Sequence, residues 1–434
     1  MLEERVREVE ALTRSQNEWR LRRTLNLIAS ENVLSERARN VLATDFGHRY
    51  AEGHPGARYY QGTEYIDAIE TKARESMREI FGCRQAEVRT ISGTNANDVV
   101  FSALVPWNAP AMVNSLPAGG HISHQLMGGL GKYTRNIVPF PRTEDGWHID
   151  VPAAKDAIFR EEPKVVVFGK SMILFREPVA ELAAVCREKG ITVIYDGAHV
   201  LGLIAGKKFQ DPLAEGADVL LGSTHKTFFG PQRGVVLSNL PDERWTRVDK
   251  MAFPGSLSNH HLFTLPPLLV AAYEMMEFGA AYATQVIANA KALGEALHRR
   301  AIEVEGREYG TTETHQVIVD VKKHGGGGKV EILLKENDII LNRNLLPKDP
   351  AKYVNNPSGL RLGVQEMTRF GMKEPEMEEI ARLFAECVID GKKVQGEVNR
   401  FRSRFQTVHF SFDHAEPSSR PKNESAIEVD LAGY

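Results

Sequence analysis

Four short apolar runs, separated by turn and helix signals, constrain the fold more than any other feature of this sequence. The runs are VVVF at 165–168, TVIY at 192–195, DVLL at 218–221 and GVVLS at 234–238. Between the first two lies PVAELAAVCREKG, which has helical spacing and ends at Gly190, a residue typical of helix C-termini. Strands that alternate with helices form a mainly parallel sheet with helices on both faces. The sequence therefore predicts an α/β fold.

The composition and spacing of residues before and after these runs predict how the chain is divided into domains. Residues 1–62 are expected to form an N-terminal helix and an arm rich in Gly, Tyr, His and Arg, with dimer contacts. Residues 63–275 would form the large domain, and residues 276–410 a smaller α+β domain entered through a long helix. The last segment, 411–434, is expected to be a loosely ordered tail.

The N-terminal helix is expected over residues 3–20 and is mostly polar. Val6, Val9 and Leu12 recur at helical spacing and share one side of it. A helix with one narrow apolar side needs a partner surface to cover that side. We therefore expect this segment to contact another part of the assembly.

Composition excludes several classes of protein. The chain has 434 residues and a formal net charge of -3, so no basic field points to nucleic acid or to an anionic membrane. Cys83, Cys186 and Cys387 lie far apart without metal-ligand spacing, which argues against a disulfide framework and against a metal site. The N-terminus has no apolar signal core, and the most apolar stretch is far shorter than the ~20 residues that span a bilayer. These features predict a cytoplasmic protein with neither a membrane nor a nucleic-acid partner.

Three polar motifs follow predicted strands or precede a predicted helix, where open α/β sheets bind ligands. In YDGAH, Asp196 directly follows a strand and His199 lies three residues later. In GSTHKTFFGPQRG, His225 and Lys226 follow the next strand. In SGTNAN, a turn from Ser92 leads into a helix, and a helix N-terminus is a favourable site for a phosphate.

Together these motifs predict binding of pyridoxal 5′-phosphate. Each motif is common alone, because an Asp after a strand is often only a helix cap and a single Lys is usually a surface residue. This cofactor needs a lysine, a carboxylate on its ring nitrogen and a phosphate cup. Lys226 must lose its proton, and shelter beside the cationic character of His225 favours that loss. Asp196 would keep the ring nitrogen protonated.

Seven motifs in register carry a resemblance to a known family. They are NLIASEN, YAEGHPGARYYQGTEYID, ISGTNAN, GGHISH, YDGAHVLGL, GSTHKTFFGPQRG and GLRLGVQEMTRFGMKE, spread in order from about residue 20 to residue 395. The set resembles serine hydroxymethyltransferase, and the stretch from YDGAH to GPQ is most similar to its archaeal-type branch. The resemblance implies a fold-type I pyridoxal-phosphate transferase that forms a homodimer or a larger homo-oligomer with shared active sites.

The resemblance also implies a set of cofactor-binding residues. Lys226 would bind the cofactor covalently, Asp196 would hold the pyridine nitrogen and His121 would stack on the ring. His124, the second histidine of GGHISH, is expected to be structural. The remaining members would hold the phosphate (Ser92, Gly93, Thr94, Ser223 and His225) or line the cofactor (Ser171 and His199).

A second implied set would bind the amino acid and move protons. Arg361 in GLRLG would clamp the carboxylate, because a guanidinium fork matches its geometry, and Ser30 would assist. Tyr50 and Glu52 would reach into the neighbouring subunit's site with Tyr60 nearby, and Glu52 would be the acid-base group. The alternatives are that Ser30 only caps a helix and that Tyr59 or Tyr60 is only a core aromatic.

The implied reaction is the reversible transfer of a one-carbon unit between serine and a reduced pterin, which gives glycine. The pterin would be tetrahydrofolate or tetrahydromethanopterin. Asn344 would approach the pterin, and a purely structural role for Asn344 remains equally open.

Two departures from the family pattern leave the substrate open. The usual glycine pair after Phe-Pro is reduced to Gly255 in AFPGSLSNHHLFTLPP, where Asn259, His260 and His261 follow. We therefore expect the partner's contacts with the phosphate to come from different atoms. In GPQRG, Gln232 stands where many members have arginine and Arg233 where the archaeal-type branch has glycine.

Two rival functions therefore stay open. The stretches LPP, EMMEFG and ETHQV resemble threonine transaldolases, so the first rival is an aldolase or transaldolase of β-hydroxy amino acids that uses no pterin. The second rival is a catalytically silent binding protein on the same scaffold. The combination of Lys226, Asp196 and Arg361 argues against the second.

Overall fold

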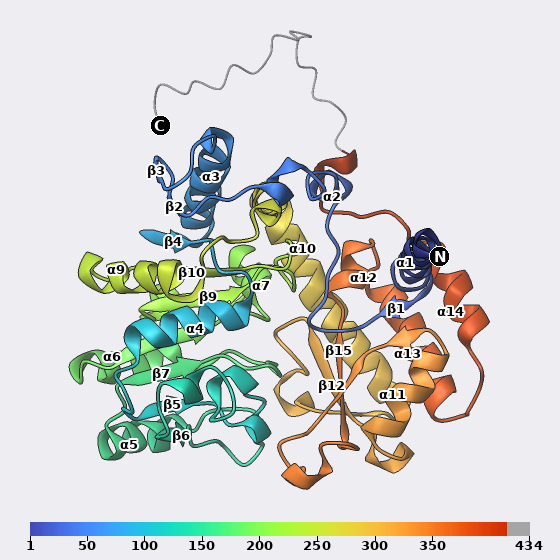
Figure 1. Ribbon diagram of the computed structural model, residues 1–434. Coiled ribbons are helices and arrows are strands. Elements are labelled where there is room, and N and C mark those ends of the chain that lie inside the picture. The colour runs from blue at the N-terminus through green and yellow to red at the C-terminus, as the bar shows by residue number, and fades with distance from the viewer. Residues whose placement is uncertain (415–434) are drawn as a thin grey trace. The chain divides into compact units, whose positions relative to one another are not determined.

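The computed structural model describes residues 1–414, and its largest element is a seven-stranded sheet (Figure 1). The strand order is β4-β10-β9-β8-β7-β5-β6. Strands β5 to β9 are all parallel, and β10 runs antiparallel to β9 and β4. The strands are β4 (Gln85–Glu87), β5 (Ala111–Val113), β6 (Ile137–Pro139), β7 (Val165–Phe168), β8 (Thr192–Asp196), β9 (Val219–Ser223) and β10 (Gly234–Ser238). The predicted α/β fold with a mainly parallel sheet is confirmed.

All four predicted strands are present, at β7, β8, β9 and β10. Every residue of these strands is buried, as expected for a sheet covered on both faces. Alternate residues such as Val165 and Val167 pack in one core cluster with Phe101 of helix α4. The helices around the sheet are α3 (Glu64–Phe81), α4 (Gly93–Leu104), α5 (Val151–Glu161), α6 (Val179–Glu188), α7 (Leu201–Ala205), α8 (Pro212–Glu215) and α9 (Asp242–Lys250).

The chain divides into two compact units. The large unit comprises residues 32–283 and, within the described part, 409–414; the small unit comprises residues 1–31 and 284–408. Helix α10 (Leu265–Arg299) contains the boundary. The first 31 residues therefore belong with the C-terminal part rather than with the rest of the predicted arm, because β1 (Leu25–Asn26) pairs in parallel with β13 (Ile339–Ile340). Of the predicted tail, residues 415–434 lie outside the described residues.

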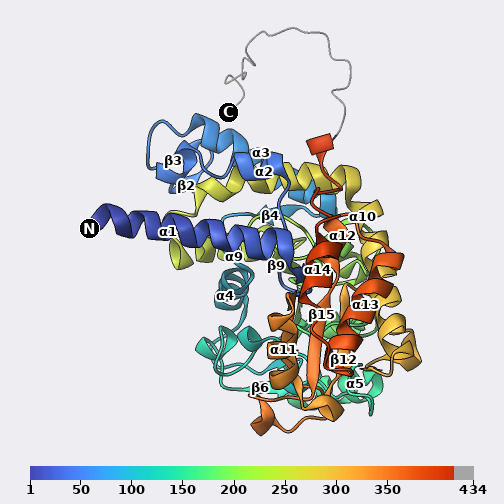
Figure 2. The ribbon, with the colours of Figure 1, turned by 90° about the vertical axis from the view of Figure 1, so that its right-hand side faces the viewer.

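The small unit is built on an antiparallel sheet of order β11-β12-β15-β14. These strands are β11 (Glu303–Val304), β12 (Gln316–Asp320), β14 (Asn342–Asn344) and β15 (Gly359–Gly363). Helices α11 (Gly327–Glu336), α13 (Glu374–Val388) and α14 (Gln395–Arg402) lie on one side of this sheet (Figure 2), and α12 (Gln365–Arg369) directly follows β15.

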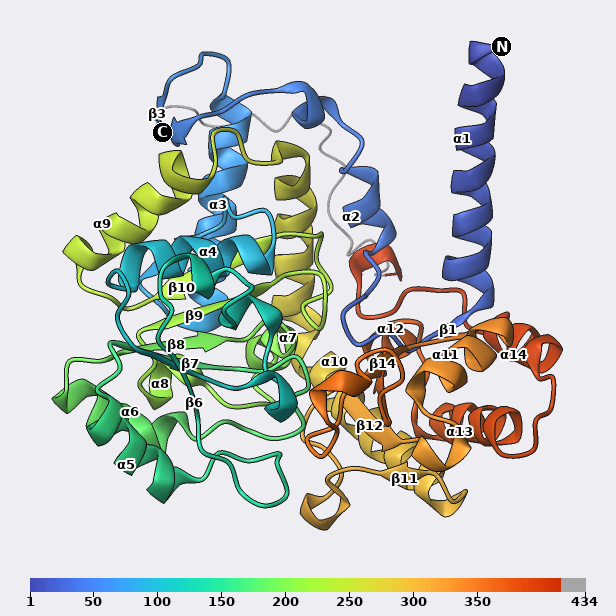
Figure 3. The same ribbon diagram turned by 60° about the horizontal axis from the view of Figure 1, so that its bottom comes forward.

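The N-terminal helix α1 (Leu2–Gln16) projects from the small unit as one straight rod (Figure 3). It is shorter than the predicted range because a π-helical turn, Asn17–Arg23, replaces its end. None of its residues is buried, and the apolar side chains of Val6, Val9 and Leu12 are exposed. No helix among residues 1–414 has the length and apolarity needed to cross a bilayer.

Residues 32–62 contain little regular structure, as their composition predicts. They hold the short helix α2 (Glu36–Asn40) and a two-stranded hairpin of β2 (Gly53–His54) and β3 (Ala57–Arg58). Gly53 has a φ of 97°, and an added Cβ would lie 2.6 Å from the carbonyl oxygen of Ala57, so only glycine fits there. This hairpin follows Glu52 directly.

Candidate active site

One cavity of the large unit gathers most of the predicted cofactor residues. It lies where β8 ends at Asp196 and β9 ends at Ser223, at the carboxyl edge of the parallel strands. The lining also includes three residues that the sequence analysis did not single out, Asn97, Lys170 and Ala198. The full lining is Gly93, Thr94, Asn97, His121, Lys170, Asp196, Ala198, His199, Ser223 and Lys226.

Asp196 is buried and held on both of its carboxylate oxygens. Oδ2 accepts hydrogen bonds from Asn97 Nδ2 at 2.7 Å and from His124 Nε2 at 3.0 Å, while Oδ1 accepts from the amide of Ala198 at 3.0 Å. Burial opposes ionisation of Asp196, but the hydrogen bond from His124 and the nearby histidines outweigh it and hold its pKa well below the usual value. Asp196 therefore stays ionised at any physiological pH.

His124 has a more direct place in the site than the sequence suggested. Its ring contacts the functional carboxylate through Nε2, and its edge lies against Phe101 of α4. Because an ionised carboxylate only accepts hydrogen bonds, the proton of His124 lies on Nε2. The neighbouring His121 donates to or accepts from Ser123 Oγ at 2.6 Å, which fixes its ring at the cavity wall.

The N-terminus of α4 forms the second part of the cavity. Ser92 is the N-cap, and its Oγ accepts from the amide of Asn95 at 3.0 Å. A Cβ on Gly93 would lie 2.3 Å from Ser223 Oγ, so the close approach of the helix to β9 requires glycine. The free amides of the first helical turn make this end suitable for an anion.

The Lys226 loop, residues 224–233, is closed by Thr224 at its base. Thr224 Oγ1 donates to the carbonyls of Pro231 at 2.6 Å and Arg233 at 3.1 Å, and the Thr224 amide also donates to Arg233 at 2.9 Å. Lys226 is buried, and its carbonyl accepts from Asn32 Nδ2 at 2.8 Å. These contacts hold the lysine on a rigid loop at the end of β9.

His225 is neutral beside this lysine, so the cationic character that the sequence analysis expected of it is wrong. Burial, followed by the charge of Lys226, lowers the pKa of His225 to about 4. Within residues 1–414, its buried Nδ1 has no hydrogen-bond partner. A buried ring nitrogen without a partner can form a hydrogen bond with a bound ligand.

Three predicted cofactor residues, Ser92, Ser171 and His225, do not line this cavity, whereas the unpredicted Lys170 does. Ser171 does not appear among the cavity-lining residues; its amide donates to the carbonyl of Gly119 at 2.7 Å and so braces the segment that leads to His121. Lys170 lines the cavity and forms an ion pair of 2.9 Å with the buried Glu177. Nothing in the sequence pattern around Lys170 distinguished it from a surface lysine.

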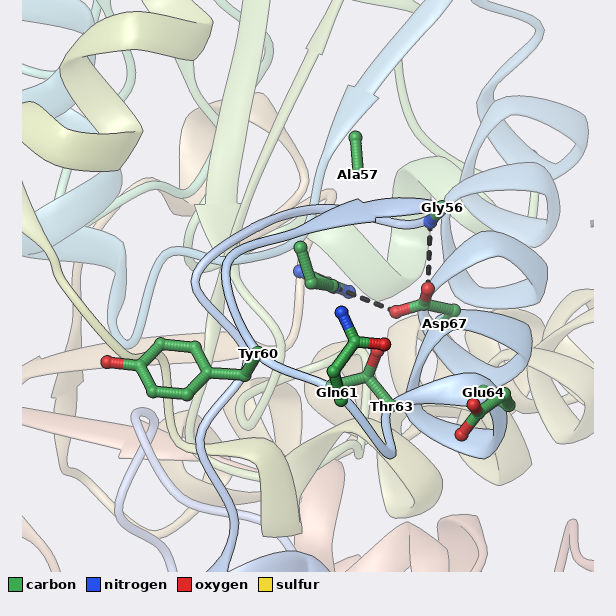
Figure 4. Close-up of a pocket in the computed structure, with 8 residues that line it drawn as sticks. Gly56, Ala57, Tyr60, Gln61, Thr63, Glu64 and Asp67 are labelled. Carbon is green, nitrogen blue, oxygen red and sulfur yellow. Dashed lines mark hydrogen bonds and ion pairs between the residues drawn. The ribbon is translucent and has the colours of Figure 1, made fainter.

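Tyr50, Glu52 and Tyr60 do not line the cavity of Lys226 in the single chain. They flank the hairpin of β2 and β3, where the rings of Tyr50 and Tyr60 are 5.1 Å apart and both side chains are half exposed. Partial burial and the charge of Glu52 raise the pKa of Tyr60. Tyr60 also lines a separate surface pocket with Gln61 and Asp67 (Figure 4).

The predicted carboxylate-binding residues belong to the small unit. Arg361 on β15 is buried, and burial lowers the pKa of its guanidinium to about 10. Its Nε and Nη2 donate to Asn342 Oδ1 at 3.3 and 3.1 Å, and Asn342 Nδ2 donates to Asn344 Oδ1 at 2.7 Å. The sequence analysis missed Asn342, although it lies two residues before Asn344. Ser30 lies in a turn whose neighbouring carbonyls, those of Ile28 and Glu31, accept from Gln365 Nε2.

The comparisons with known proteins agree with this geometry. A sequence model described as "Serine hydroxymethyltransferase" matches residues 2–384. The chain belongs to the serine hydroxymethyltransferase family. The membership identifies it as an enzyme, a transferase of the glycine hydroxymethyltransferase class in serine and glycine one-carbon metabolism.

Similar curated members of the serine hydroxymethyltransferase family come from archaea. A serine hydroxymethyltransferase of Thermococcus kodakarensis is 49% identical over 406 residues, which cover 92% of this chain and 94% of that protein. A serine hydroxymethyltransferase from Archaeoglobus fulgidus is 47% identical over 399 residues, which cover 91% of this chain and 91% of that protein. A serine hydroxymethyltransferase from Saccharolobus islandicus is 47% identical over 417 residues, which cover 95% of this chain and 96% of that protein.

A solved structure confirms the fold type. An L-threonine transaldolase from Pseudomonas fluorescens, in the internal aldimine state, has a TM-score of 0.86 and 28% identity, with 96% of each chain covered. The predicted fold-type I architecture of pyridoxal-phosphate enzymes is therefore confirmed. The same neighbour comes from the enzyme class that the sequence analysis kept as a rival.

The residues of the large-unit cavity fit pyridoxal phosphate. The cavity offers a buried ionised carboxylate at Asp196 and a buried lysine at Lys226. It also offers the N-terminus of α4 at Gly93, where an added Cβ would lie 2.3 Å from Ser223 Oγ. Next to Lys226 in the chain, the buried Nδ1 of His225 has no hydrogen-bond partner within residues 1–414. Among residues 1–414, no group of three or more His, Cys, Asp or Glu could hold a metal ion.

Proposed function

We propose that this chain catalyses the reversible transfer of a one-carbon unit between serine and a reduced pterin, with glycine as the second product. The observation that carries the proposal is the presence of Asp196 and Lys226 in one cavity at the N-terminus of α4. The family membership and the printed names of its archaeal relatives support the same reaction.

The cavity residues would divide the binding of pyridoxal phosphate among them. Lys226 would bind it covalently, Asp196 would pair with its ring nitrogen and His121 would stack on its ring. The phosphate would bind at Ser92, Gly93, Thr94, Ser223 and His225, with His199 and Ser171 close by. The bound cofactor supplies an electron sink for bond cleavage at the α carbon of an amino acid.

The other residues would bind the amino acid and move protons. Arg361, assisted by Ser30, would bind the carboxylate in a bidentate manner and so orient the bond to be broken. Glu52 would hold and move the proton of the substrate hydroxyl, with Tyr50 and Tyr60 beside it. Asn344 would approach a pterin, either tetrahydrofolate or tetrahydromethanopterin.

This arrangement favours at least two subunits, because Glu52 and Tyr50 do not line the Lys226 cavity of their own chain. We propose that they complete the site of a second copy in a homodimer or larger homo-oligomer. The exposure of both tyrosines and of α1 supports a surface that a second copy covers. A cytoplasmic location stays a prediction.

The experiment that tests this function compares serine cleavage with and without a pterin. Purified protein loaded with pyridoxal phosphate should convert serine to glycine much faster with tetrahydrofolate or tetrahydromethanopterin than without either. Lys226→Ala should abolish both the activity and the absorption band of the bound cofactor.

A second candidate is a threonine aldolase or transaldolase, favoured by the likeness to the Pseudomonas fluorescens enzyme. The same preparation should be given threonine, alone and with an acceptor aldehyde. Rapid threonine cleavage together with no effect of either pterin on serine would reject the transferase and support this candidate.

A further inference from the structure

Arg233, which the sequence left without a role, is completely buried at the end of the Lys226 loop. Its Nε donates to the carbonyl of Val88 at 2.5 Å, and its Nη1 donates to the carbonyl of His261 at 2.8 Å and to Thr264 Oγ1. Its Nη2 lies 2.5 Å from His260 Nδ1. Arg233 therefore joins the Lys226 loop to the segment that replaces the usual glycine pair, whereas the adjacent Gln232 is exposed.

His260 passes this connection to helix α3. A guanidinium group has donors but no acceptor, so His260 Nδ1 must accept from Arg233 and Nε2 must carry the proton. Nε2 then donates to Glu70 Oε2, 3.1 Å away. Burial lowers the pKa of His260 to about 4, so the ring is neutral and keeps this single tautomer at physiological pH.

Glu70 connects the ring to Arg58. Burial opposes its ionisation, but the hydrogen bond from His260 and the charges of Arg74 and Arg58 hold the pKa of Glu70 well below its usual value. Its Oε2 accepts from Arg58 Nη2 at 2.7 Å. Arg58 also donates from Nε to Asp67 Oδ1 at 2.8 Å, and Asp67 Oδ2 accepts from the amide of Gly56 (Figure 4).

The chain of contacts ends on the backbone around Glu52. Arg58 Nη1 donates to the carbonyl of Ala51 at 2.9 Å and to that of Gly53 at 2.8 Å, on either side of Glu52. We call residues 49–53 the Glu52 turn. Four buried side chains, those of Arg233, His260, Glu70 and Arg58, thus link the Lys226 loop to the Glu52 turn.

A second set of contacts runs from the same segment to the same turn. Asn259 Oδ1 accepts from the amide of Ala51 at 3.0 Å, and Asn259 Nδ2 donates to the carbonyl of Arg49 at 3.1 Å. The hydroxyl of Tyr50 lies 3.0 Å from Ser258 Oγ. The position of residues 258–260 therefore sets the position of the Glu52 turn both directly and through Glu70.

We propose that Arg233 and His260 are positioning residues that hold the Glu52 turn in place relative to the Lys226 loop. The inference rests on the proposed function, because it takes Glu52 as the proton-moving group. A role in stability alone explains the network less well, since buried charged groups are often no more stabilising than apolar residues of the same size. In a dimer of the proposed kind, the network would connect one subunit's lysine loop with the acid-base group of the neighbouring site.

Two substitutions of His260 separate its two hydrogen bonds. In His260→Asn, the amide can replace Nδ1 toward Arg233 but is too short to reach Glu70. In His260→Gln, the amide can replace Nε2 toward Glu70 but leaves Arg233 without its acceptor. His261→Asn is the matched control, because the side chain of His261 is exposed and only its backbone contacts Arg233.

We expect His260→Asn to lower kcat about 10- to 100-fold, since a displacement of roughly 1 Å of a catalytic group costs rates of that order. KM for serine and the absorption of the bound cofactor should change less than threefold, because the Lys226 loop keeps its contact with Arg233. His260→Gln should lower kcat less, and His261→Asn should stay within about twofold of the unaltered enzyme.

A double-mutant cycle with Glu52→Gln shows whether His260 acts through Glu52. If it does, His260→Asn should cause little further loss of kcat in the Glu52→Gln background. Equal, multiplicative losses in both backgrounds would overturn the positioning role. An unchanged kcat in Glu52→Gln alone would instead reject the proposed role of Glu52, so the two failures are distinguishable.

Amide hydrogen exchange gives a readout that does not depend on activity. In the cofactor-free protein, His260→Asn should speed exchange at residues 49–60 at least tenfold, while residues 222–238 exchange as in the unaltered protein. Exchange that rises equally across both segments, or in neither, would contradict the proposal even where the activity of Glu52→Gln is too low to measure.

Discussion

Arg361 donates from both Nε and Nη2 to the single side-chain oxygen of Asn342, over 3.3 and 3.1 Å. The amide nitrogen of the same side chain donates to Asn344 Oδ1. One asparagine therefore orients the proposed carboxylate clamp and the residue proposed to approach the pterin.

Substitution of Asn342 should weaken the binding of both serine and the pterin. We expect Asn342→Ala to raise KM for serine about tenfold, since an orienting hydrogen bond to a charged group contributes roughly 1.5–3 kcal/mol, and to raise KM for the pterin as well. Cofactor affinity should not change. Arg343→Ala is the control, because that exposed residue pairs with Glu331 instead; an equal KM effect there would contradict the prediction.

Loss of the His124 contact should weaken cofactor binding. His124→Ala removes one of the hydrogen bonds that keep the pKa of Asp196 low, and a bond to a charged group contributes about 1.5–3 kcal/mol. We expect the dissociation constant of pyridoxal phosphate, followed by its absorption, to rise about tenfold or more. An unchanged constant would show that Asn97 and Ala198 suffice to hold Asp196.

A methyl group at position 93 should block the phosphate end of the cavity. Gly93→Ala places a Cβ 2.3 Å from Ser223 Oγ, so the Ser223 hydroxyl must leave its position or the helix N-terminus must move away from β9. We expect cofactor affinity to fall more than tenfold in an absorption titration. The double variant Gly93→Ala, Ser223→Ala should recover part of this loss; no recovery would mean that another contact sets the spacing.

Glu366 should make stability fall as pH rises toward neutrality. Burial, followed by the charge of Glu31, raises the pKa of Glu366 to about 7, so the folded chain binds a proton that the unfolded chain has released. The stability is complete below the unfolded value near 4.3 and is lost as the pH rises through about 7, by at most about 4 kcal/mol in total. Urea unfolding from pH 5 to 8 should show this decline, and Glu366→Gln should remove it.

In acid, the pH dependence of stability has the opposite sign, and stability falls as the pH falls. Burial disfavours ionisation of Glu87, but its ion pair with Arg89 lowers the pKa to about 2, and the pKa of Asp196 is lowered as well. Their contribution to stability is present above pH 4–5 and is lost as the pH falls through the folded values. Glu87→Gln should reduce the loss of unfolding free energy between pH 5 and pH 3; an unchanged slope would exclude Glu87 as a source.

Local patterns predicted the sheet and the residues at its edge. The runs that became β7 to β10 are rich in Val, Ile and Leu, which suit strands buried on both faces. Asp196 and Lys226 follow such runs directly, so the place where the strands end also sets the place of these side chains.

The remaining site contacts join residues that are distant in sequence. His124 meets Asp196 across 72 positions and Arg233 meets Val88 across 145, and only the order of the strands brings them together. No periodicity in a single sequence records such pairs. The role of Arg233 could therefore be found only from its contacts in the fold.

The pairing of β1 with β13 has a consequence for synthesis on the ribosome. Leu25 meets Ile339, so the first strand must wait for more than three hundred further residues before its partner exists. At about 5–20 residues per second, that delay is roughly 15–60 s. During this time Leu25 and Leu27, which are fully covered in the finished protein, lack the C-terminal part of the small unit, including the partner strand β13. The nascent chain is thus an expected client of chaperones that bind short apolar segments near the N-terminus.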